Sequence, residues 1–302
     1  MPELPEVETI RRQLEPEIVG KRIAEASVLD ERWSRPVAPA EVETTLAGRR
    51  IDAVERRGKY LILRLDGKLA LVMHLRMTGN LVLAPLADGA RRMVGDRLYP
   101  APDAPRFMRA LFVLDDGTEL RFTDARRFGH GAVIADADLD TYFAERLGVE
   151  PLSGELTVEA LAEIAAGRRA PLKSFLLNQS GIAGIGNIYA DEALHRAELH
   201  PLSPAGSMRT EHLEALREGI VGALEAGLEN GGASMDDYRD ARGEAGSMQD
   251  EFLVHTREGQ PCNRCGTEIK RIVVGGRSTY FCPGCQVRLR RRRRPAVRAR
   301  TR

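Results

Sequence analysis

All four cysteines of this 302-residue chain fall in one short segment near its C-terminal end. They form two Cys-x2-Cys pairs, Cys262 with Cys265 and Cys282 with Cys285, which residues 266–281 separate. Such spacing is typical of a small hairpin whose two turns supply four thiolates to one tetrahedral Zn²⁺ ion. Two disulfides are the alternative, which a reducing compartment would disfavour. Because four protein ligands leave no position for water, we expect one structural zinc ion.

The segment between the cysteine pairs predicts two strands, residues 269–274 and 279–281, joined by a turn at Gly275-Gly276. This ribbon is too short to bury a core, so we interpret it as a metal-braced hairpin that presents side chains. Arg277, next to this turn, is the side chain that we expect the hairpin to present to a ligand. An ordinary solvated arginine is the alternative.

Short apolar runs separated by turn residues occupy much of residues 22–134. Asp66-Gly67 and Asp115-Asp116-Gly117 are hairpin signals between such runs. The long helices that parallel crossovers require are missing there, so we predict an antiparallel β-sandwich. The predicted strands are residues 50–54, 60–65, 69–74, 80–83, 110–114, 120–123 and 131–134.

The composition changes at Pro151, after which helical periodicity dominates over residues 158–166, 172–178, 188–197 and 210–228. The predicted fold class is α+β with two domains, an N-terminal antiparallel β-sandwich with flanking helices and a C-terminal helical domain that carries the four-cysteine zinc ribbon. The predicted boundaries are residues 1–135 for the first domain, 136–150 for a linker, 151–260 for the helical domain, 261–286 for the ribbon and 287–302 for a disordered basic tail.

The start of the chain places a proline, Pro2, beside a carboxylate, Glu3. Removal of Met1 would expose the proline amine, and an α-amine with a reference pKa of about 7.7 to 8 is partly neutral, and so nucleophilic, near pH 7. Apolar residues recur at helical spacing from Val7 onward, which predicts a helix that holds this terminus in place. The alternative is that Pro2 and Pro5 merely open the helix.

The net charge of +1 hides an uneven distribution. The segment after Cys285 holds nine arginines and no acid, and removing nine positive charges from +1 leaves −8 on residues 1–285. A nucleic-acid surface must therefore be a clustered basic face, and the tail is interpreted as a nonspecific DNA-binding arm. There is no apolar run of about 18 residues and no secretion signal, so we expect a cytoplasmic protein without membrane contact.

Three further segments carry candidate nucleic-acid contacts. The glycine-rich turn before Asn187 could offer backbone N–H groups to a phosphate, or could be a tight interhelical turn. Met77 and Phe128 lie at two predicted loop tips, where they could enter a base stack or could be core residues. Arg126 and Arg127 directly precede Phe128. Lys59, at the start of a strand, could bind phosphate, act as a second amine or be solvated.

Together these segments resemble the bacterial formamidopyrimidine-DNA glycosylase family (Fpg or MutM) of the Fpg/Nei superfamily. The resemblance extends from Pro2 to about Gln286 and rests on six motifs: MPELPEVET, RRGKYL, HLRMTG, TDARRFG, AGIGNIYADEAL and CNRC…RSTYFCPGC. It implies that a monomer binds damaged double-stranded DNA between the sandwich domain and a helix-two-turn-helix domain with a zinc ribbon. Residues 230–260 resemble the mobile loop that closes over the flipped base.

The resemblance also implies roles for single residues. Pro2 would form a Schiff base at the sugar C1′, Glu3 would protonate the ring oxygen, and Lys59 would bind phosphate next to the lesion and assist catalysis. The side chains that would fill the gap after base flipping are Met77, Arg126 and Phe128, and those that would hold the bent phosphate backbone are Lys173, Asn187 and Arg277, the last also counted with the catalytic group. Arg106 and Arg127 are additional candidate DNA contacts. Residues 105–108 stand where relatives often carry a Lys-His-x-His segment, and Arg106 would replace a phosphate contact of that segment.

The implied activity is that of a bifunctional glycosylase and AP lyase of base excision repair, acting on oxidised purines such as 8-oxoguanine and formamidopyrimidines. It needs no organic cofactor and would act at the nucleoid. Leu4 favours the purine-directed branch, because relatives that act on oxidised pyrimidines begin MPEGPE. A pyrimidine-directed glycosylase and a catalytically silent damaged-DNA-binding protein are the alternatives.

Overall fold

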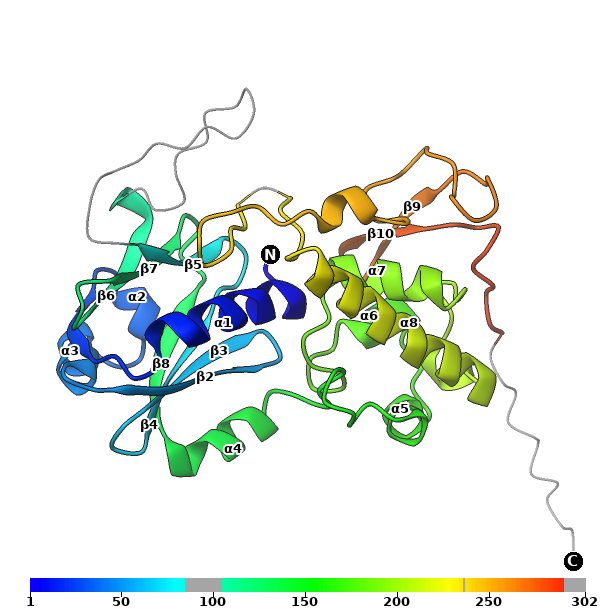
Figure 1. The fold of residues 1–302 in the computed structure, drawn as a ribbon. Helices are drawn as coiled ribbons and strands as arrows, with labels where there is room; N and C mark the ends of the chain where they lie inside the picture. Colours follow the sequence, from blue (N-terminus) through cyan, green and yellow to red (C-terminus); the bar gives the residue numbers. More distant parts are fainter. Residues whose placement is uncertain (85–104, 236, 291–302) are drawn as a thin grey trace, which may run out of the picture. The chain divides into compact units, whose positions relative to one another are not determined.

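The computed structural model describes residues 1–84, 105–235 and 237–290 (Figure 1). Contacts divide the chain into two compact units. The first consists of Met1–Glu150, Ile182–Gly186 and Leu224–Glu251, and the second of Pro151–Gly181, Asn187–Ala223 and Phe252–Arg302. Two segments that the sequence places in the helical domain, residues 182–186 and 224–251, therefore belong with the sandwich.

The first unit is built on two four-stranded antiparallel sheets, as predicted. Each predicted hairpin signal joins two neighbouring strands. Asp66-Gly67 lies between β3 (Tyr60–Leu65) and β4 (Leu69–His74), and residues 115–117 lie between β6 (Met108–Leu114) and β7 (Glu119–Asp124). One sheet has the order β1 (Ile23–Val28), β6 (Met108–Leu114), β7 (Glu119–Asp124), β5 (Gly79–Ala84), and the other the order β2 (Ile51–Arg57), β3 (Tyr60–Leu65), β4 (Leu69–His74), β8 (His130–Ala135).

One hydrophobic core unites residues of both sheets with the buried face of helix α1 (Leu4–Ile18). Strand β3 is buried on both faces, because Leu61 and Leu63 enter this core while Tyr60 and Ile62 pack on the other side with residues of α4 (Asp136–Ala144). This explains why its sequence is almost continuously apolar rather than alternating. The core holds α1, and with it the start of the chain, against β2 and β3 (Figure 1).

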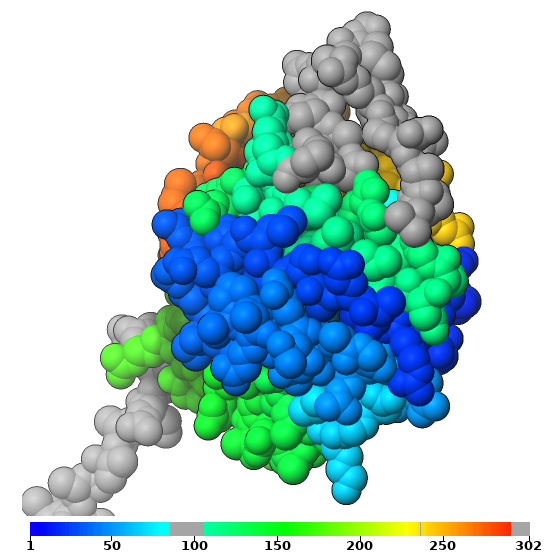
Figure 2. Space-filling view, turned by 90° about the vertical axis from the view of Figure 1, so that its left-hand side faces the viewer, coloured from blue at the N-terminus to red at the C-terminus, as the bar shows by residue number. Residues whose placement is uncertain are grey.

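Two short helices, α2 (Glu31–Ser34) and α3 (Pro39–Leu46), follow β1. Their part of the chain, in blue, covers much of the face that Figure 2 shows. Trp33 of α2 is buried and packs against Phe112 and Phe122. Strand β1 and both helices are absent from the sequence prediction.

The second unit contains the predicted helices α5 (Val158–Ala165), α6 (Leu172–Leu176), α7 (Asn187–Arg196) and the first part of α8 (Thr210–Glu229). It also contains the hairpin of β9 (Lys270–Val274) and β10 (Arg277–Phe281). Single 3-10 turns lie at Pro105–Phe107, Ala205–Ser207 and Met248–Glu251. Among the described residues, no helix combines the length and apolar character needed to span a membrane.

The first residues of the predicted basic tail are bound by the second unit. Val287 donates its N–H to the carbonyl of Glu198 (2.8 Å), and Leu289 donates to the hydroxyl of Ser203 (3.0 Å). The expected disorder from residue 287 onward is therefore wrong for these first residues, because the second unit binds their backbone. Residues 291–302 lie outside the described part of the chain.

Candidate active site

The start of the chain is anchored by the glycine-rich turn of the first unit. Pro2 and Glu3 are buried. A Glu3 carboxylate oxygen accepts the N–H of Gly186 (2.7 Å), and Leu4 donates its N–H to the carbonyl of Gly184 (3.0 Å). A Cβ at residue 186 would lie 2.2 Å from the Glu3 carboxyl carbon, so only glycine allows this approach. The turn that the sequence offered to a phosphate thus binds the carboxylate of Glu3.

Lys59 meets the same turn. Its side chain is buried, and Nζ donates to the carbonyl of Ile185 at 3.0 Å. Two neighbouring residues of one turn, Ile185 and Gly186, therefore hold the Lys59 ammonium and the Glu3 carboxylate. Burial rules out the simple solvated role for Lys59.

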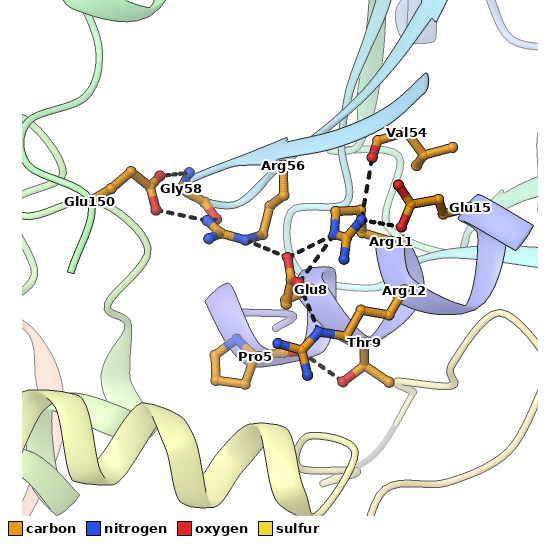
Figure 3. A network of polar contacts seen from close by, with 10 residues as sticks. All are labelled: Pro5, Glu8, Thr9, Arg11, Arg12, Glu15, Val54, Arg56, Gly58 and Glu150. Carbon is orange, nitrogen blue, oxygen red and sulfur yellow. Dashed lines mark hydrogen bonds and ion pairs between the residues drawn. The ribbon is translucent and has the colours of Figure 1, made fainter. Parts of the chain in front are cut away.

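A charged network fixes the two elements that carry these groups (Figure 3). Arg56 of β2 donates to Glu8 of α1 (3.1 Å), to Glu150 (2.9 Å) and to the Gly58 carbonyl (3.0 Å). Glu150 in turn accepts the Gly58 N–H. Although burial alone would raise the pKa of Glu8, Arg12, Arg11 and Arg56 together lower it, so the carboxylate stays charged. The network joins the first turns of α1 to the turn that precedes Lys59.

One buried carboxylate organises the loops that carry Met77, Arg126 and Phe128. Asp124 accepts the N–H groups of Arg126 (3.1 Å) and Phe128 (2.8 Å), and also that of Gly129 and the Thr78 hydroxyl. Phe128 is 54% exposed, and the Arg126 guanidinium lies 4.9 Å from its ring centroid. Phe128 is therefore not a core residue, and Met77 is half-buried in the loop that Thr78 ties to Asp124.

Arg127 and Arg106, which the sequence offers as DNA contacts, each contact a neighbouring side chain of the first unit. Arg127 pairs with Asp30 through two contacts, at 2.5 and 2.7 Å, and this hydrogen-bonded pair lowers the pKa of Asp30. Its guanidinium therefore braces the loop. Arg106 is exposed in the 3-10 turn and stacks over Phe107 at 4.5 Å. Most of the doubtful loop before it, residues 85–104, lies outside the described residues.

Lys173 is not placed to bind DNA phosphate. Its side chain is 0% exposed, and Nζ donates to Asp191 (2.7 Å) and to the Asn187 carbonyl (2.6 Å). Asp191 also bonds the ring of His255 at 2.8 Å. The sequence could not reveal this burial, because it depends on a carboxylate 18 residues further along the chain.

Arg277 lies in the zinc ribbon of the second unit, and Asn187 contacts that ribbon. The Asn187 amide donates to the carbonyl of Ser278 in β10 (3.0 Å), next to Arg277. Arg277 is exposed and is the first residue of that strand. Asn187 therefore fixes the strand that presents Arg277.

The four cysteines converge as a metal site requires. Their sulfur atoms all lie within 4.8 Å of one another, with Cys262 to Cys285 at 3.8 Å and Cys265 to Cys282 at 3.5 Å. A tetrahedral Zn²⁺ with sulfurs at about 2.3 Å needs sulfur–sulfur separations of about 3.8 Å. The donor set fits zinc, and no disulfide joins these free cysteines.

Two buried acids of the site were missed from the sequence. Glu6 uses one oxygen for the Glu3 N–H (2.8 Å) and the other for the Ala233 N–H (2.7 Å). Asp124 acts as described above. An acid in the first helical turn and an aspartate that opens a polar turn are the signals that could have indicated them.

Comparisons with known proteins place this geometry in a family. The model for the formamidopyrimidine-DNA glycosylase N-terminal domain matches residues 1–131, that for its H2TH domain residues 147–239, and that for a zinc finger found in FPG and IleRS residues 259–287. The chain belongs to the formamidopyrimidine-DNA glycosylase family. The predicted family, fold class and structural zinc are thereby confirmed, and the chain is an enzyme of the DNA glycosylase class.

Individual relatives extend over nearly the whole chain. The formamidopyrimidine-DNA glycosylase of Roseiflexus sp. strain RS-1 is 45% identical and covers 95% of this chain and 100% of its own length. That of Chloroflexus aurantiacus is 43% identical, with 95% and 98% covered. A crystal structure of Lactococcus lactis Fpg with DNA containing an abasic site has a TM-score of 0.83 at 33% identity, covering 95% of this chain and 100% of that one.

Proposed function

We propose that the protein excises oxidised purines from duplex DNA and then cleaves the strand, with Pro2 as nucleophile. After removal of Met1, the neutral amine attacks C1′ while Glu3 protonates the ring oxygen, and the bond to the base breaks. The resulting iminium acidifies the C2′ proton, which permits β- and then δ-elimination. Proton transfer and covalent catalysis come from the chain itself.

The observation that carries this proposal is the pairing of Glu3 and Lys59 on one turn. The N–H of Gly186 binds the Glu3 carboxylate, and the carbonyl of Ile185 accepts from Lys59. Both contacts lie at the N-terminal end of α1, whose first residue is Leu4. A fixed geometry of this kind is what a covalent step at one sugar requires. Leu4 itself packs against Gly184, whose φ is +83°.

The remaining site residues act on the DNA. Phe128, Arg126 and Met77 would occupy the stack that the extruded base leaves, and the exposed Phe128 ring suits such insertion. Arg277 and Asn187 would act at the phosphate backbone, whereas Lys173 acts through Asn187 rather than on DNA. A chromosomal substrate would place the protein at the nucleoid, where the arginines beyond Arg290 add a nonspecific contact.

Two substitutions test the assigned chemistry. Pro2→Gly and Glu3→Gln should abolish release of 8-oxoguanine from a duplex while lesion binding remains measurable, since neither residue grips the DNA. Glu17→Gln, on an exposed position of the same helix, serves as control. A Pro2→Gly or Glu3→Gln protein that releases the base at the normal rate contradicts the assigned roles.

The lesion class is tested separately. Release of 8-oxoguanine should exceed release of thymine glycol under the same conditions. The reverse order would assign the protein to the pyrimidine-directed branch, and binding without release of either base would indicate a silent damage-binding protein.

A further inference from the structure

A histidine lies directly against the zinc ligands. His195, in the last turn of α7, places Nε2 3.4 Å from the sulfur of Cys262. Both side chains are buried, with 2% of each residue exposed. Among the described residues, the other ring nitrogen, Nδ1, has no hydrogen-bond partner. The sequence motifs of the chain gave this histidine no role.

The chemistry of the pair defines which atom carries the proton. A cysteine that ligates zinc is a thiolate and can only accept a hydrogen bond. A neutral imidazole has one N–H group, and the proton at Nε2 gives the ring a partner that Nδ1 does not have. We propose that His195 is an outer-shell residue of the zinc site, donating its Nε2–H to the Cys262 thiolate.

This contact completes a set of bonds between α7 and the ribbon side of the second unit. At the start of the helix, Asn187 donates to the Ser278 carbonyl (3.0 Å). Near its middle, the carboxylate of Glu192 accepts the N–H groups of residues 253, 254 and 255 at 2.9 to 3.0 Å. At its end, His195 bonds Cys262. The helix that begins with Asn187 is therefore fastened to the metal site itself.

Two effects on the zinc site follow. The N–H donor withdraws charge from the sulfur and so makes protonation and release of Cys262 less favourable. The buried helix also restricts movement of the first cysteine knuckle. Loss of an outer-shell donor typically lowers metal affinity by about 10-fold to 100-fold, so removing the His195 donor should speed zinc loss by at least about tenfold.

The test compares two replacements in the zinc-loaded, full-length protein. His195→Phe fills the space without a donor, and His195→Gln keeps an N–H group that reaches a similar position. We expect zinc transfer to a chromophoric chelator to be about tenfold faster for His195→Phe and near the wild-type rate for His195→Gln. His212→Gln, at the start of α8 and remote in sequence from the cysteines, is the matched control. Equal release rates for the wild type and His195→Phe would overturn the proposal.

A spectroscopic measurement on the wild-type protein tests the proposal even if a variant fails to fold. Nitrogen NMR of the zinc-loaded protein should show His195 neutral, with hydrogen on Nε2 and none on Nδ1. Hydrogen on Nδ1 with a metal-shifted Nε2 would instead make His195 a zinc ligand and overturn the proposal, as would hydrogen on Nδ1 alone. In cobalt-substituted protein, the thiolate-to-metal charge-transfer band should shift in His195→Phe and not in His212→Gln.

Discussion

Replacement of Arg56 by methionine tests whether the charged network positions the active site. The side chain is 11% exposed and bonds Glu8, Glu150 and the Gly58 carbonyl. A hydrogen bond to a charged group contributes about 1.5–3 kcal/mol, and breaking a fully buried ion pair costs about 3–5 kcal/mol. Glu8 keeps Arg11 and Arg12, and Glu150 keeps the Gly58 N–H, so we expect a loss of about 2–3 kcal/mol in the free energy of unfolding.

The chain supplies its own probe and control. Trp33 is the one tryptophan of the sequence and is buried in the core of the first unit, so its fluorescence in a urea titration reports the unfolding of that unit. Arg12 bonds the same Glu8 carboxylate from a side chain that is 57% exposed. Arg12→Met should therefore cost only about 0.5 kcal/mol.

The same pair of variants separates stability from function. Arg56→Met removes one of the two side-chain contacts that hold Gly58, and it should slow base excision because the position of Lys59 beside Ile185 is then less restrained. Arg12→Met should leave the excision rate unchanged. If the two substitutions lower the free energy of unfolding equally, the argument that burial and the turn contacts make Arg56 important is refuted.

Three other outcomes are expected. Asp124→Asn leaves too few acceptors for the Arg126, Phe128 and Gly129 N–H groups, so the affinity for lesion DNA should fall about tenfold, near 1.4 kcal/mol, in a binding titration. Asp138→Asn, the control, should leave the affinity unchanged. Equal affinities of Asp124→Asn and the wild type would contradict the role of Asp124 in holding the loops. Burial, with Arg76, His130 and Lys59 nearby, holds the pKa of His74 well below its usual range, so the folded ring stays neutral while the unfolded one gains a proton below about pH 6.5. As the pH is lowered below about 6.5, this group should therefore decrease the free energy of unfolding by up to about 1.4 kcal/mol per pH unit. His74→Asn should make that decrease less steep, and an unchanged slope would contradict the role given to His74. Truncation after Arg290 should make DNA binding less dependent on salt concentration without loss of stability. An unchanged salt dependence would mean that the tail does not bind DNA.

The sequence predicts the strands well where the apolar pattern is strong. Strands β3 and β4 begin and end at the predicted residues, because both lie in the apolar interior and are bounded by turn signals. Strand β1 escapes prediction because Glu25 and Ser27 interrupt its apolar residues. Helix α2 has only four residues, too few for a helical period to show.

The site depends on contacts between distant residues, which a local pattern cannot reveal. The motifs indicate that Glu3, Lys59 and the glycine turn belong to one function, but not that Gly186 binds the carboxylate and Ile185 the ammonium. In the same way, a conspicuous lysine such as Lys173 suggests a phosphate contact until its buried partner Asp191 is known. Charge and motif predict which residues matter, and burial decides what each one can touch.

The central claim is that the amine of Pro2 attacks the sugar. Borohydride reduction during reaction with an 8-oxoguanine duplex should trap a covalent protein–DNA adduct, and peptide mass mapping should place the linkage on Pro2. Protein that intact mass shows to retain Met1 should give no adduct, because its Pro2 nitrogen is an amide. An adduct on Lys59, or none with Met1-free protein that still excises the base, would contradict the account.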